Sequence, residues 1–219
     1  MKCDLCPRKC LVDRKKGEKG ICGQTENLKV ARAALHFWEE PCISGDAGSG
    51  AVFFSGCPLH CVFCQNENIA NGTVGKEISL ERLVDIFLEL QEKRANNINL
   101  VTPGHFVPQI VKALDQARKE GLTLPVVYNT SSYETVDTIK MLEGYVDIYL
   151  PDFKYMSPVL SKKYSHAPDY AEVAKAAIAE MVRQTGKAVF VNGDEDNLIL
   201  SGTIVRHLTL PGCMADSMQ

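Results

Sequence analysis

Short, uninterrupted apolar runs alternate along the chain with longer segments in which apolar residues recur every three or four positions. Uninterrupted runs are typical of strands buried on both faces, whereas the three- and four-residue spacing is typical of amphipathic helices. The runs predict strands at residues 51–55, 99–102, 125–129, 146–150 and 203–210, with a short pairing segment at 188–191. The spaced segments predict helices at residues 79–95, from Pro108 to a stop at Gly121, at 135–143 and at 169–185.

Strands that alternate with helices imply right-handed βαβ units and a parallel sheet. No G-x-G-x-x-G motif follows any predicted strand, so the fingerprint of a dinucleotide-binding fold is missing. The pattern therefore favours an α/β fold built as a whole or partial (βα) barrel, in which chemistry gathers at the carboxyl ends of the strands. Polar groups follow the predicted strands at these ends: the loop 57–64, His105, Asn129, Thr130, Ser131, Asp152, Lys154, Arg206 and His207.

The first 50 residues carry a different pattern, with few apolar positions and four cysteines in a C-x2-C-x3-C-x11-C spacing. Four thiolates fill either a tetrahedral zinc site or a fully ligated iron–sulfur cluster. Because this piece is too poor in apolar residues to fold by burial alone, a bound metal would supply the missing stability. Structural zinc, an accessory cluster and free or redox-active thiols are all open for Cys3, Cys6, Cys10 and Cys22. We therefore divide the chain into a cysteine-rich extension, residues 1–50, and a barrel region, residues 51–219.

The segment 31–45 ends this extension and holds His36, Glu39 and Glu40, which could line a site. Charged residues are usually exposed, so a solvated connector is the competing interpretation. Cys42 has no cysteine neighbour in the sequence, and an isolated cysteine is by default a buried, inert thiol.

Composition restricts the class of protein. The 219 residues, 45% of them hydrophobic and 23% charged, fit one large globular domain, or one domain with a small appendage. A net charge of −3 and the lack of a long basic run argue against a nucleic-acid-binding surface. The chain has neither a signal-peptide pattern at its start nor an apolar run near the ~18 residues of a membrane span. Nine cysteines, most of them in tight groups, suit metal binding in a reducing compartment, so we expect a cytoplasmic protein without a membrane partner.

The most informative stretch follows the first predicted strand, where Cys57, Cys61 and Cys64 lie within eight residues. A loop this short can turn all three sulfurs toward one point. Iron–sulfur cubanes are normally held by four cysteine thiolates, so three ligands leave one iron free for a small chelating molecule that can accept an electron. The competing interpretation is a zinc site made of these three cysteines and His60.

With Phe63 before its last cysteine, the loop matches a C-x3-C-x-aromatic-C motif and resembles the radical SAM superfamily. The resemblance implies a [4Fe–4S] cluster on the three cysteines, with S-adenosylmethionine bound through its amino and carboxylate groups at the free iron. It also implies reductive cleavage of S-adenosylmethionine to methionine and a 5′-deoxyadenosyl radical, which abstracts a hydrogen atom. In such chemistry the cofactor reacts, and the protein binds, orients and excludes water.

Six further segments and the cysteine-rich amino terminus carry a narrower resemblance that covers almost the whole chain: residues 39–41, 48–50, 64–66, 128–131, 149–154 and 205–208. They are similar to radical SAM proteins of the pyruvate formate-lyase activating enzyme-like group. This resemblance implies abstraction of a glycine α-hydrogen from a glycyl-radical protein, with an electron donor such as flavodoxin or ferredoxin. Analogy at this level does not establish a substrate.

By the same resemblance Asn129 lies near S-adenosylmethionine, and Asp152 and Lys154 match an Asp-x-Lys pair at the fourth strand. Lys154 would reach the methionine carboxylate, because an ammonium on a long stem suits a point-charge contact. Arg206 matches an arginine on the fifth strand that orders these groups. The competing interpretation of Asp152 and Lys154 is an exposed ion pair of little energetic value. His207 faces away from its neighbour Arg206 on a strand, so we expect it to serve in packing.

Two departures from the group's pattern bear on activity. Activating enzymes hold the amino group of S-adenosylmethionine with a Gly-Gly-Glu run, whereas this chain has Thr102-Pro103-Gly104-His105, which leaves the backbone or Thr102 as substitutes. The sequence also ends before the helix and sixth strand that relatives add, so we expect a partial barrel without its last βα unit. A non-catalytic iron–sulfur or zinc module for binding or assembly is the alternative function.

Overall fold

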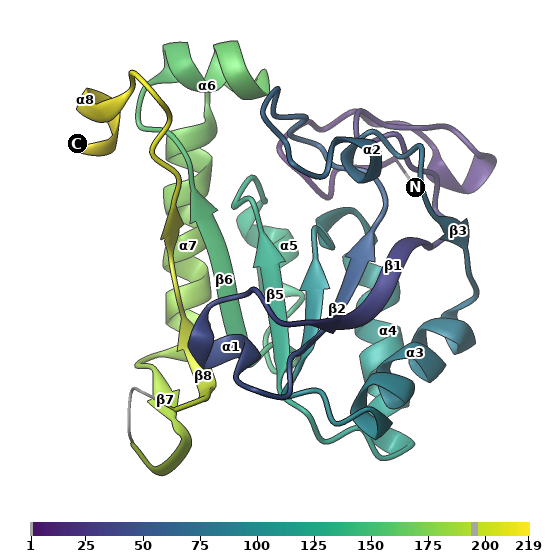
Figure 1. Cartoon of the computed structure of the whole chain (residues 1–219). Coiled ribbons are helices and arrows are strands. Elements are labelled where there is room, and N and C mark those ends of the chain that lie inside the picture. Colours follow the sequence, from purple (N-terminus) through teal and green to yellow (C-terminus); the bar gives the residue numbers. More distant parts are fainter. Residues whose placement is uncertain (1, 194–196) are drawn as a thin grey trace.

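The structure is a computed structural model that describes residues 2–193 and 197–219. Within these residues one sheet of nine strands runs through the chain (Figure 1), in the order β3-β1-β2-β4-β5-β6-β8-β7, with β9 beside β6. The strands are β1 (Lys29–His36), β2 (Ser49–Phe54), β3 (Lys76–Glu77), β4 (Ile98–Val101), β5 (Val126–Thr130), β6 (Ile148–Phe153), β7 (Val189–Phe190), β8 (Ile199–Thr203) and β9 (Arg206–His207).

Five neighbouring strands, β2, β4, β5, β6 and β8, run parallel. Their register aligns Val52 with Leu100, and Leu100 with Tyr128. β9 follows β8 and is parallel to the last part of β6, where Arg206 pairs with Asp152. The mostly parallel sheet confirms the expected α/β class and partial (βα) barrel.

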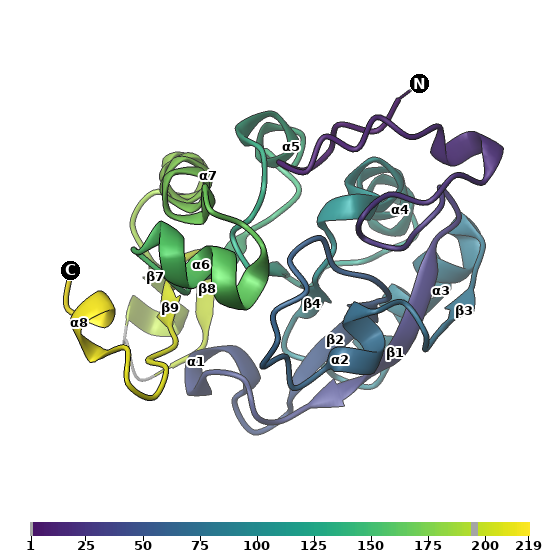
Figure 2. The ribbon, with the colours of Figure 1, turned by 90° about the horizontal axis from the view of Figure 1, so that it is seen from above.

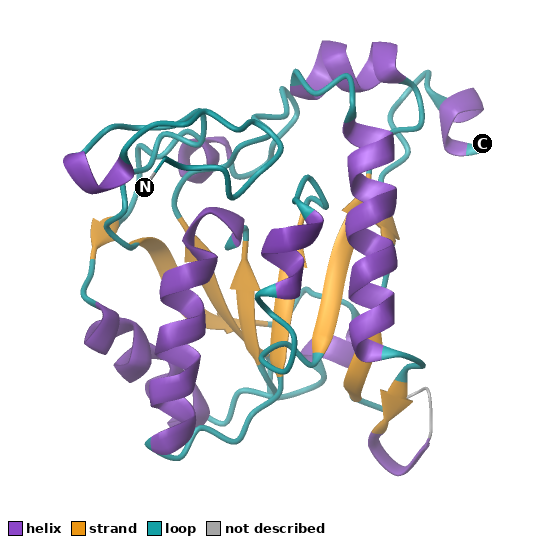
Figure 3. Ribbon diagram, turned by 180° about the vertical axis from the view of Figure 1, so that it is seen from behind, coloured by secondary structure: helices purple, strands orange, loops and turns teal. Residues whose placement is uncertain are grey.

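The longer helices that follow the parallel strands cover one face of the sheet, as Figure 3 shows from behind. The helix signals of the sequence are confirmed where they were strongest: Ser79 accepts a hydrogen bond from the backbone N–H of Arg82 at the start of α3, and Gly186 follows the end of α7. The helices are α1 (Pro41–Ser44), α2 (Glu67–Ala70), α3 (Leu80–Glu92), α4 (Val107–Lys119), α5 (Val136–Lys140), α6 (Pro158–Ser165), α7 (Tyr170–Thr185) and α8 (Met214–Ser217).

Side chains alternate between the two faces of the sheet, as the strand geometry requires. On the helix-covered face, the main core includes Val52, Leu100, Tyr128 and Tyr149. On the opposite face, Ile43 of α1 packs with Val127, Ile148 and Leu150. Figure 1 shows α1 in front of the lower part of the sheet, so the upper part of this inner face is left for the polar strand ends.

β1 is a strand that the hydrophobic pattern did not reveal. It runs antiparallel to β2, pairing Ala33 with Val52 and His36 with Ser49, and β3 pairs with its other edge. Only Val30 is buried along its length, so the alternation typical of a strand is absent. The interpretation of residues 31–36 as part of a solvated connector is therefore wrong, because backbone hydrogen bonds rather than side-chain burial hold this segment.

The last predicted strand and one helix also differ from expectation. β8 begins at Ile199, which is buried, and β9 ends at His207, whereas the prediction placed one strand at 203–210. Val205 and Leu208 are 48% and 43% exposed, so the apolar residues that suggested the later boundary lie largely outside the core. The helix expected at 135–143 ends at Lys140.

The cysteine-rich extension lies along the end of the barrel, beside α5 and α4 (Figure 2). The hydroxyl of Thr138 on α5 donates to the carbonyl oxygen of Leu5 at 2.7 Å. The side-chain amide of Gln109 on α4 donates to the carbonyl oxygen of Glu26 at 2.8 Å. The division of the chain at residue 50 stays a prediction, since β1 joins earlier residues to the sheet. None of the helices in the described residues is long and apolar enough to traverse a lipid bilayer.

Candidate functional site

The loop with three cysteines begins where β2 ends, at the carboxyl edge of the parallel sheet. Gly56 has a φ of +90°, and the carbonyl oxygen of Cys22 occupies the space that a side chain at this position would need. His60 has a φ of +49°, and a hydrogen bond of 3.0 Å from the N–H of Cys64 to the carbonyl of Cys61 closes the last turn. The loop therefore bends several times within a few residues, as the cysteine spacing predicts.

The thiols of this loop are close enough to influence one another. Burial raises the pKa of the Cys57 thiol to about 11, and the thiols of Cys61 and Cys64 add to that rise. Burial also raises the pKa of Cys61; the hydroxyl of Ser165, which donates to its Sγ at 3.0 Å, and the charge of Lys154 oppose the rise. The thiolate is the form that binds metal, so a positively charged group among the sulfurs would offset the cost of burying the charge.

His60, the proposed fourth ligand of a zinc site in this loop, already has other partners. Among the described residues, no three His, Cys, Asp or Glu side chains are placed to share one metal ion. Tetrahedral zinc needs four ligands at about 2.0–2.3 Å from one point. Both ring nitrogens of His60, the proposed fourth zinc ligand, are engaged, with Asn71 at 3.2 Å and the carbonyl of Ile21 at 2.8 Å. In a cubane each thiolate binds a different iron, so a cluster held by the three cysteines needs no ligand from His60.

An apolar shell surrounds the loop on its inner side. The ring of Phe63 lies 6.4 Å from the rings of Tyr155 and Tyr164, and Tyr155 lies 5.4 Å from Tyr170. Leu59, between the first two cysteines, is fully buried in the same cluster. The aromatic position of the cysteine motif therefore packs against two tyrosine rings beside the loop.

A network of polar side chains lies at the ends of β5, β6 and β9, with Arg206 at its centre. Nε of Arg206 donates to Oδ1 of Asp152 at 2.9 Å, and its two Nη atoms contact Oδ1 of Asn129 at 2.7 Å and Oε2 of Glu39 at 3.2 Å. Nζ of Lys154 donates to Oδ2 of Asp152 at 2.6 Å. The structure thus brings together the four residues expected to bind S-adenosylmethionine, on three strands distant in sequence.

The charges of this network are partly buried. The side chains of Lys154 and Asp152 are 13% and 22% exposed, so the interpretation as an exposed ion pair is wrong. Oε1 of Glu40 lies 3.8 Å from Arg206 and joins the same group. Three carboxylates, of Glu39, Glu40 and Asp152, face two cations, which leaves a net charge of −1. A residual negative charge at a partly desolvated site favours a ligand that carries positive charge.

Glu39 enters the network from the segment between β1 and α1. Its side chain is 10% exposed, and its Oε1 accepts a hydrogen bond of 3.2 Å from the amide of Asn129. Burial raises the pKa of Glu39, and the guanidinium of Arg206 opposes that rise. The sequence marked Glu39 only as a candidate with a solvated connector as the alternative; the packing of Ile43 on the inner face of the sheet places Glu39 in the site.

The cysteine loop lies within a stretch of the chain that matches known proteins. The family model described as the radical SAM superfamily matches residues 51–196. The chain belongs to the radical SAM superfamily. The uncharacterized protein MJ0674 of Methanocaldococcus jannaschii is 28% identical to this chain over 215 residues. That match covers 95% of this chain and 57% of the relative, so the chain spans little more than half of the relative's length.

Members of the radical SAM superfamily are generally enzymes that use a [4Fe–4S] cluster and S-adenosylmethionine, so membership implies both groups for this chain. The matched residues begin at β2 and include the cysteine loop, β5 and β6. Arg206 lies beyond them, and its place in the site rests on its contacts with Asp152, Asn129 and Glu39.

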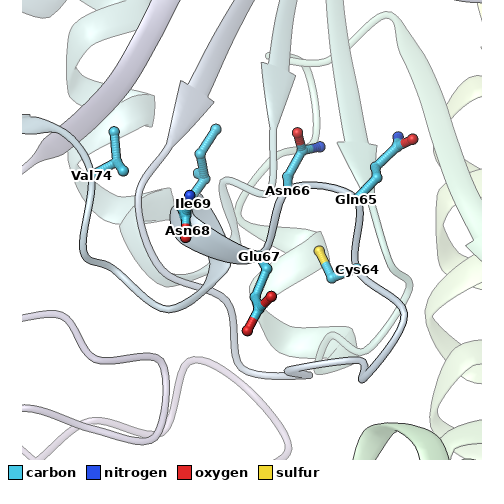
Figure 4. A pocket seen from close by; sticks show the side chains of 7 residues that line it. All are labelled: Cys64, Gln65, Asn66, Glu67, Asn68, Ile69 and Val74. Carbon is cyan, nitrogen blue, oxygen red and sulfur yellow. The ribbon is translucent and has the colours of Figure 1, made fainter.

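Of the three cysteines in the radical SAM loop, Cys64 borders a pocket of about 450 Å³ (Figure 4). The side chains that follow it in sequence, including those of Gln65, Asn66 and Glu67, supply polar atoms to the lining. Open, polar space large enough for a small molecule therefore lies beside Cys64.

Three predicted strand-end residues do not join the charged network of the radical SAM domain. His105 is 2% exposed, its Nε2 lies 2.8 Å from the carbonyl oxygen of Ser55, and burial lowers its pKa to about 4. Thr102 has a φ of +55°, and its N–H donates to the carbonyl of Asn129 at 2.9 Å. His207 is exposed, so the expected packing role is wrong. Its Nδ1 lies 2.7 Å from the backbone carbonyl oxygen of Phe153 in β6.

Sequence reasoning missed Asn99, which lies inside β4 on the same face as Asn129. It is fully buried, and among the described residues neither atom of its amide has a hydrogen-bond partner. Oε2 of Glu40 is also buried without a partner. A polar residue within an otherwise apolar strand was the available signal.

The four cysteines of the extension lie near one another at the end of the radical SAM domain. Cys6 and Cys22 are 6% and 5% exposed, and Cys3 and Cys10 are partly exposed. Burial raises the pKa of Cys6 to about 12, and the thiols of Cys22 and Cys10 add to the rise. The fold therefore gathers the residues of the predicted second site, whose occupant the geometry alone leaves open between zinc and a cluster.

Proposed function

We propose that this chain is a radical SAM enzyme in which Cys57, Cys61 and Cys64 hold a [4Fe–4S] cluster beside a site for S-adenosylmethionine. The observation that carries the proposal is the position of Cys61 between two groups. Its sulfur accepts a hydrogen bond from Ser165, and it is close enough to Lys154 for the ammonium to lower its pKa. The charged network at the strand ends therefore adjoins the cysteine loop at Cys61.

Each residue of the network has a role in binding or orientation. Lys154 is placed to meet the carboxylate of the methionine moiety as a point charge, and Asp152 holds its ammonium in position. Arg206 fixes Asp152 and Asn129 relative to one another, because its planar guanidinium contacts both. The net negative charge of the network suits the cationic sulfonium.

When bound, a [4Fe–4S] cluster with one free iron supplies the electron that cleaves S-adenosylmethionine to methionine and a 5′-deoxyadenosyl radical. The rings of Phe63, Tyr155 and Tyr164 exclude water from the loop, which protects a reactive species from side reactions. Flavodoxin or ferredoxin is the expected electron donor, since radical SAM enzymes commonly use these carriers.

The substrate is the finer part of the proposal. The resemblance to the pyruvate formate-lyase activating enzyme-like group points to a glycine α-hydrogen of a glycyl-radical protein. Glu40 supports a polar ligand at this network, because its Oε2 is buried without a hydrogen-bond partner among the described residues while its Oε1 lies near Arg206. Incubation with a glycyl-radical protein, S-adenosylmethionine and reductant should give a glycyl-radical signal in electron paramagnetic resonance; its absence with competent protein would remove this substrate class.

Anaerobic reconstitution tests the core of the proposal. The wild-type chain should become brown and release 5′-deoxyadenosine when S-adenosylmethionine and dithionite are added, and Cys61→Ala should abolish the release. Cys42→Ala is the matched control, because this cysteine lies outside both cysteine groups. A fully loaded loop cluster that releases no nucleoside would favour a non-catalytic binding or assembly module, and tight zinc without visible absorbance would favour a zinc protein.

A further inference from the structure

The strongest cluster of ligating side chains outside the proposed active site is the group Cys3, Cys6, Cys10 and Cys22. Its backbone is folded tightly around the sulfurs: the N–H of Cys3 donates to the carbonyl of Val12 at 2.9 Å, and that of Leu11 donates to the carbonyl of Cys3 at 3.0 Å. The four thiols are therefore held by a defined fold, not by a flexible tail.

Several features of this fold suit a group bound to the sulfurs. Lys9 and Leu11 have φ values of +41° and +54°, a backbone conformation that side chains disfavour. Gly20 leaves room for Sγ of Cys10, which would lie 2.8 Å from a Cβ at that position. Two of the thiols are almost fully buried, although no disulfide joins any of the four. A metal centre would explain the strained turns and the buried thiols together.

The position of this group beside the radical SAM loop favours a cluster over zinc. The loop cysteines belong to a superfamily that binds a four-iron cluster at this position. The N-terminal group has the four thiolates that a fully ligated cluster needs, and a cluster can exchange electrons with a neighbouring cluster, whereas zinc has no redox chemistry.

The N-terminal group adjoins the cysteine loop at three points. The carbonyl of Cys22 packs against Gly56, which directly precedes Cys57. Nε2 of His60, inside the loop, lies 2.8 Å from the carbonyl of Ile21. The guanidinium of Arg8, between Cys6 and Cys10, donates to the carbonyl of Pro58 at 2.9 Å. The two sets of cysteines are therefore linked by direct contacts between the segments that carry them.

The other side of the group faces solvent. Leu11 and Ile21, next to Cys10 and Cys22, are 52% and 49% exposed, and Cys3 and Cys10 are themselves partly exposed. A centre at this position would touch both an external carrier and the loop, whereas the loop is shielded on its inner side by the aromatic rings.

We propose that Cys3, Cys6, Cys10 and Cys22 hold a second iron–sulfur cluster that accepts one electron from an external carrier and passes it to the loop cluster. Each transfer moves one electron, with no bond made or broken, and the reductant is a low-potential protein carrier of the flavodoxin or ferredoxin class. The relay rests on the proposed function, since it needs a cluster at the loop. The assignment of a second cluster to the N-terminal cysteines does not depend on the proposed function.

Metal content after anaerobic reconstitution tests the second cluster directly. Two four-iron clusters give about eight irons and eight sulfides per chain. The variant Cys57→Ala/Cys61→Ala/Cys64→Ala should keep about four of each, and Cys3→Ala/Cys10→Ala should keep the four of the loop. Cys42→Ala should keep all of them. A triple variant that holds one zinc ion, or no metal, would overturn the assignment, whether or not the wild type releases 5′-deoxyadenosine.

Stopped-flow reduction of the loop cluster tests the relay. With reduced flavodoxin as donor, Cys3→Ala/Cys10→Ala should be reduced at least tenfold more slowly than the wild type. With dithionite, which is small enough to reach the loop through the pocket at Cys64, the two rates should agree within about twofold. Equal rates with flavodoxin would overturn the relay, and slow reduction by both donors would mean that the variant disturbs the loop itself.

Discussion

The guanidinium of Arg206 is held by the carboxylate of Asp152 through a hydrogen bond of 2.9 Å between Nε and Oδ1, across 54 positions of sequence. The register of β9 on β6 makes the two residues direct neighbours. The same carboxylate binds Lys154 through its other oxygen. One strand pairing thus sets the geometry of both cations in the proposed site for S-adenosylmethionine.

Arg206→Lys should weaken binding of S-adenosylmethionine about tenfold or more, which corresponds to ~1.4 kcal/mol. An ammonium cannot contact Asp152, Asn129 and Glu39 in one plane as the guanidinium does, so the network loses its alignment. Equilibrium binding to the anaerobically reconstituted protein measures the change. Arg82→Lys is the control, because this arginine is 46% exposed in a surface ion pair. Equal affinities of the two variants would show that Arg206 does not order the site.

Ser165→Ala should lower the reduction potential of the loop cluster. The hydroxyl of Ser165 donates to Sγ of Cys61 at 3.0 Å, and a hydrogen bond to a ligating sulfur favours the reduced, more negative state. A redox titration followed by electron paramagnetic resonance measures the potential. Ser161→Ala is the control variant and should leave the potential unchanged. Ser161 lies on the same helix and is buried, but its hydroxyl donates to the backbone carbonyl of Pro158 instead of a sulfur. A potential that stays constant in both variants would contradict the assignment of Cys61 as a ligand.

Gly56→Ala should destabilise the protein by about 2–5 kcal/mol. A left-handed backbone costs about 1–2 kcal/mol for a residue with a Cβ, and overlap with the carbonyl of Cys22 adds about 1–3 kcal/mol. Gly144→Ala should cost only the first of these, because Gly144 has a φ of +80° with no atom near its Cβ position. Urea unfolding of both variants separates steric contact from backbone conformation. Equal losses would mean that the extension does not pack on the loop as described.

Glu134→Gln should remove a pH dependence of stability. Glu134 is buried beside the hydroxyls of Thr130 and Tyr128, and burial raises its pKa from 4.5 to about 7. The folded state therefore holds this proton more tightly than the unfolded chain, so stability falls as the pH rises from about 4.5 to about 7. The wild type should lose up to about 3 kcal/mol across this window.

The glutamine variant keeps an acceptor for the two hydroxyls without a titratable proton, so it should be the more stable protein above pH 7. Urea unfolding between pH 5 and pH 8, with both proteins in the same metal state, measures the two slopes. Glu92→Gln at the exposed end of α3 should leave the wild-type slope unchanged. If Glu134→Gln keeps the full slope, another group is responsible for it.

Local patterns in the sequence were sufficient for the parallel strands β2, β4, β5 and β6 and for the helices α3, α4 and α7. The runs at β2, β4 and β5 are largely apolar because both faces of a parallel strand are covered. The start of α3 is visible in the sequence because the cap by Ser79 involves a residue only three positions away. The three cysteines of the loop were found in the same way, since their spacing is a local property of the chain.

The tertiary structure decided the rest. β1 lacks an apolar face. Its pairing with β2 depends on backbone hydrogen bonds, which the pattern of side chains in the sequence does not reveal. Glu39 contacts Arg206 only because α1 packs on the inner face of the sheet and brings distant segments together. The side-chain types of Asp152 and Arg206 are visible in the sequence, whereas their contact depends on the register of two strands, which is set by long-range hydrogen bonding and packing.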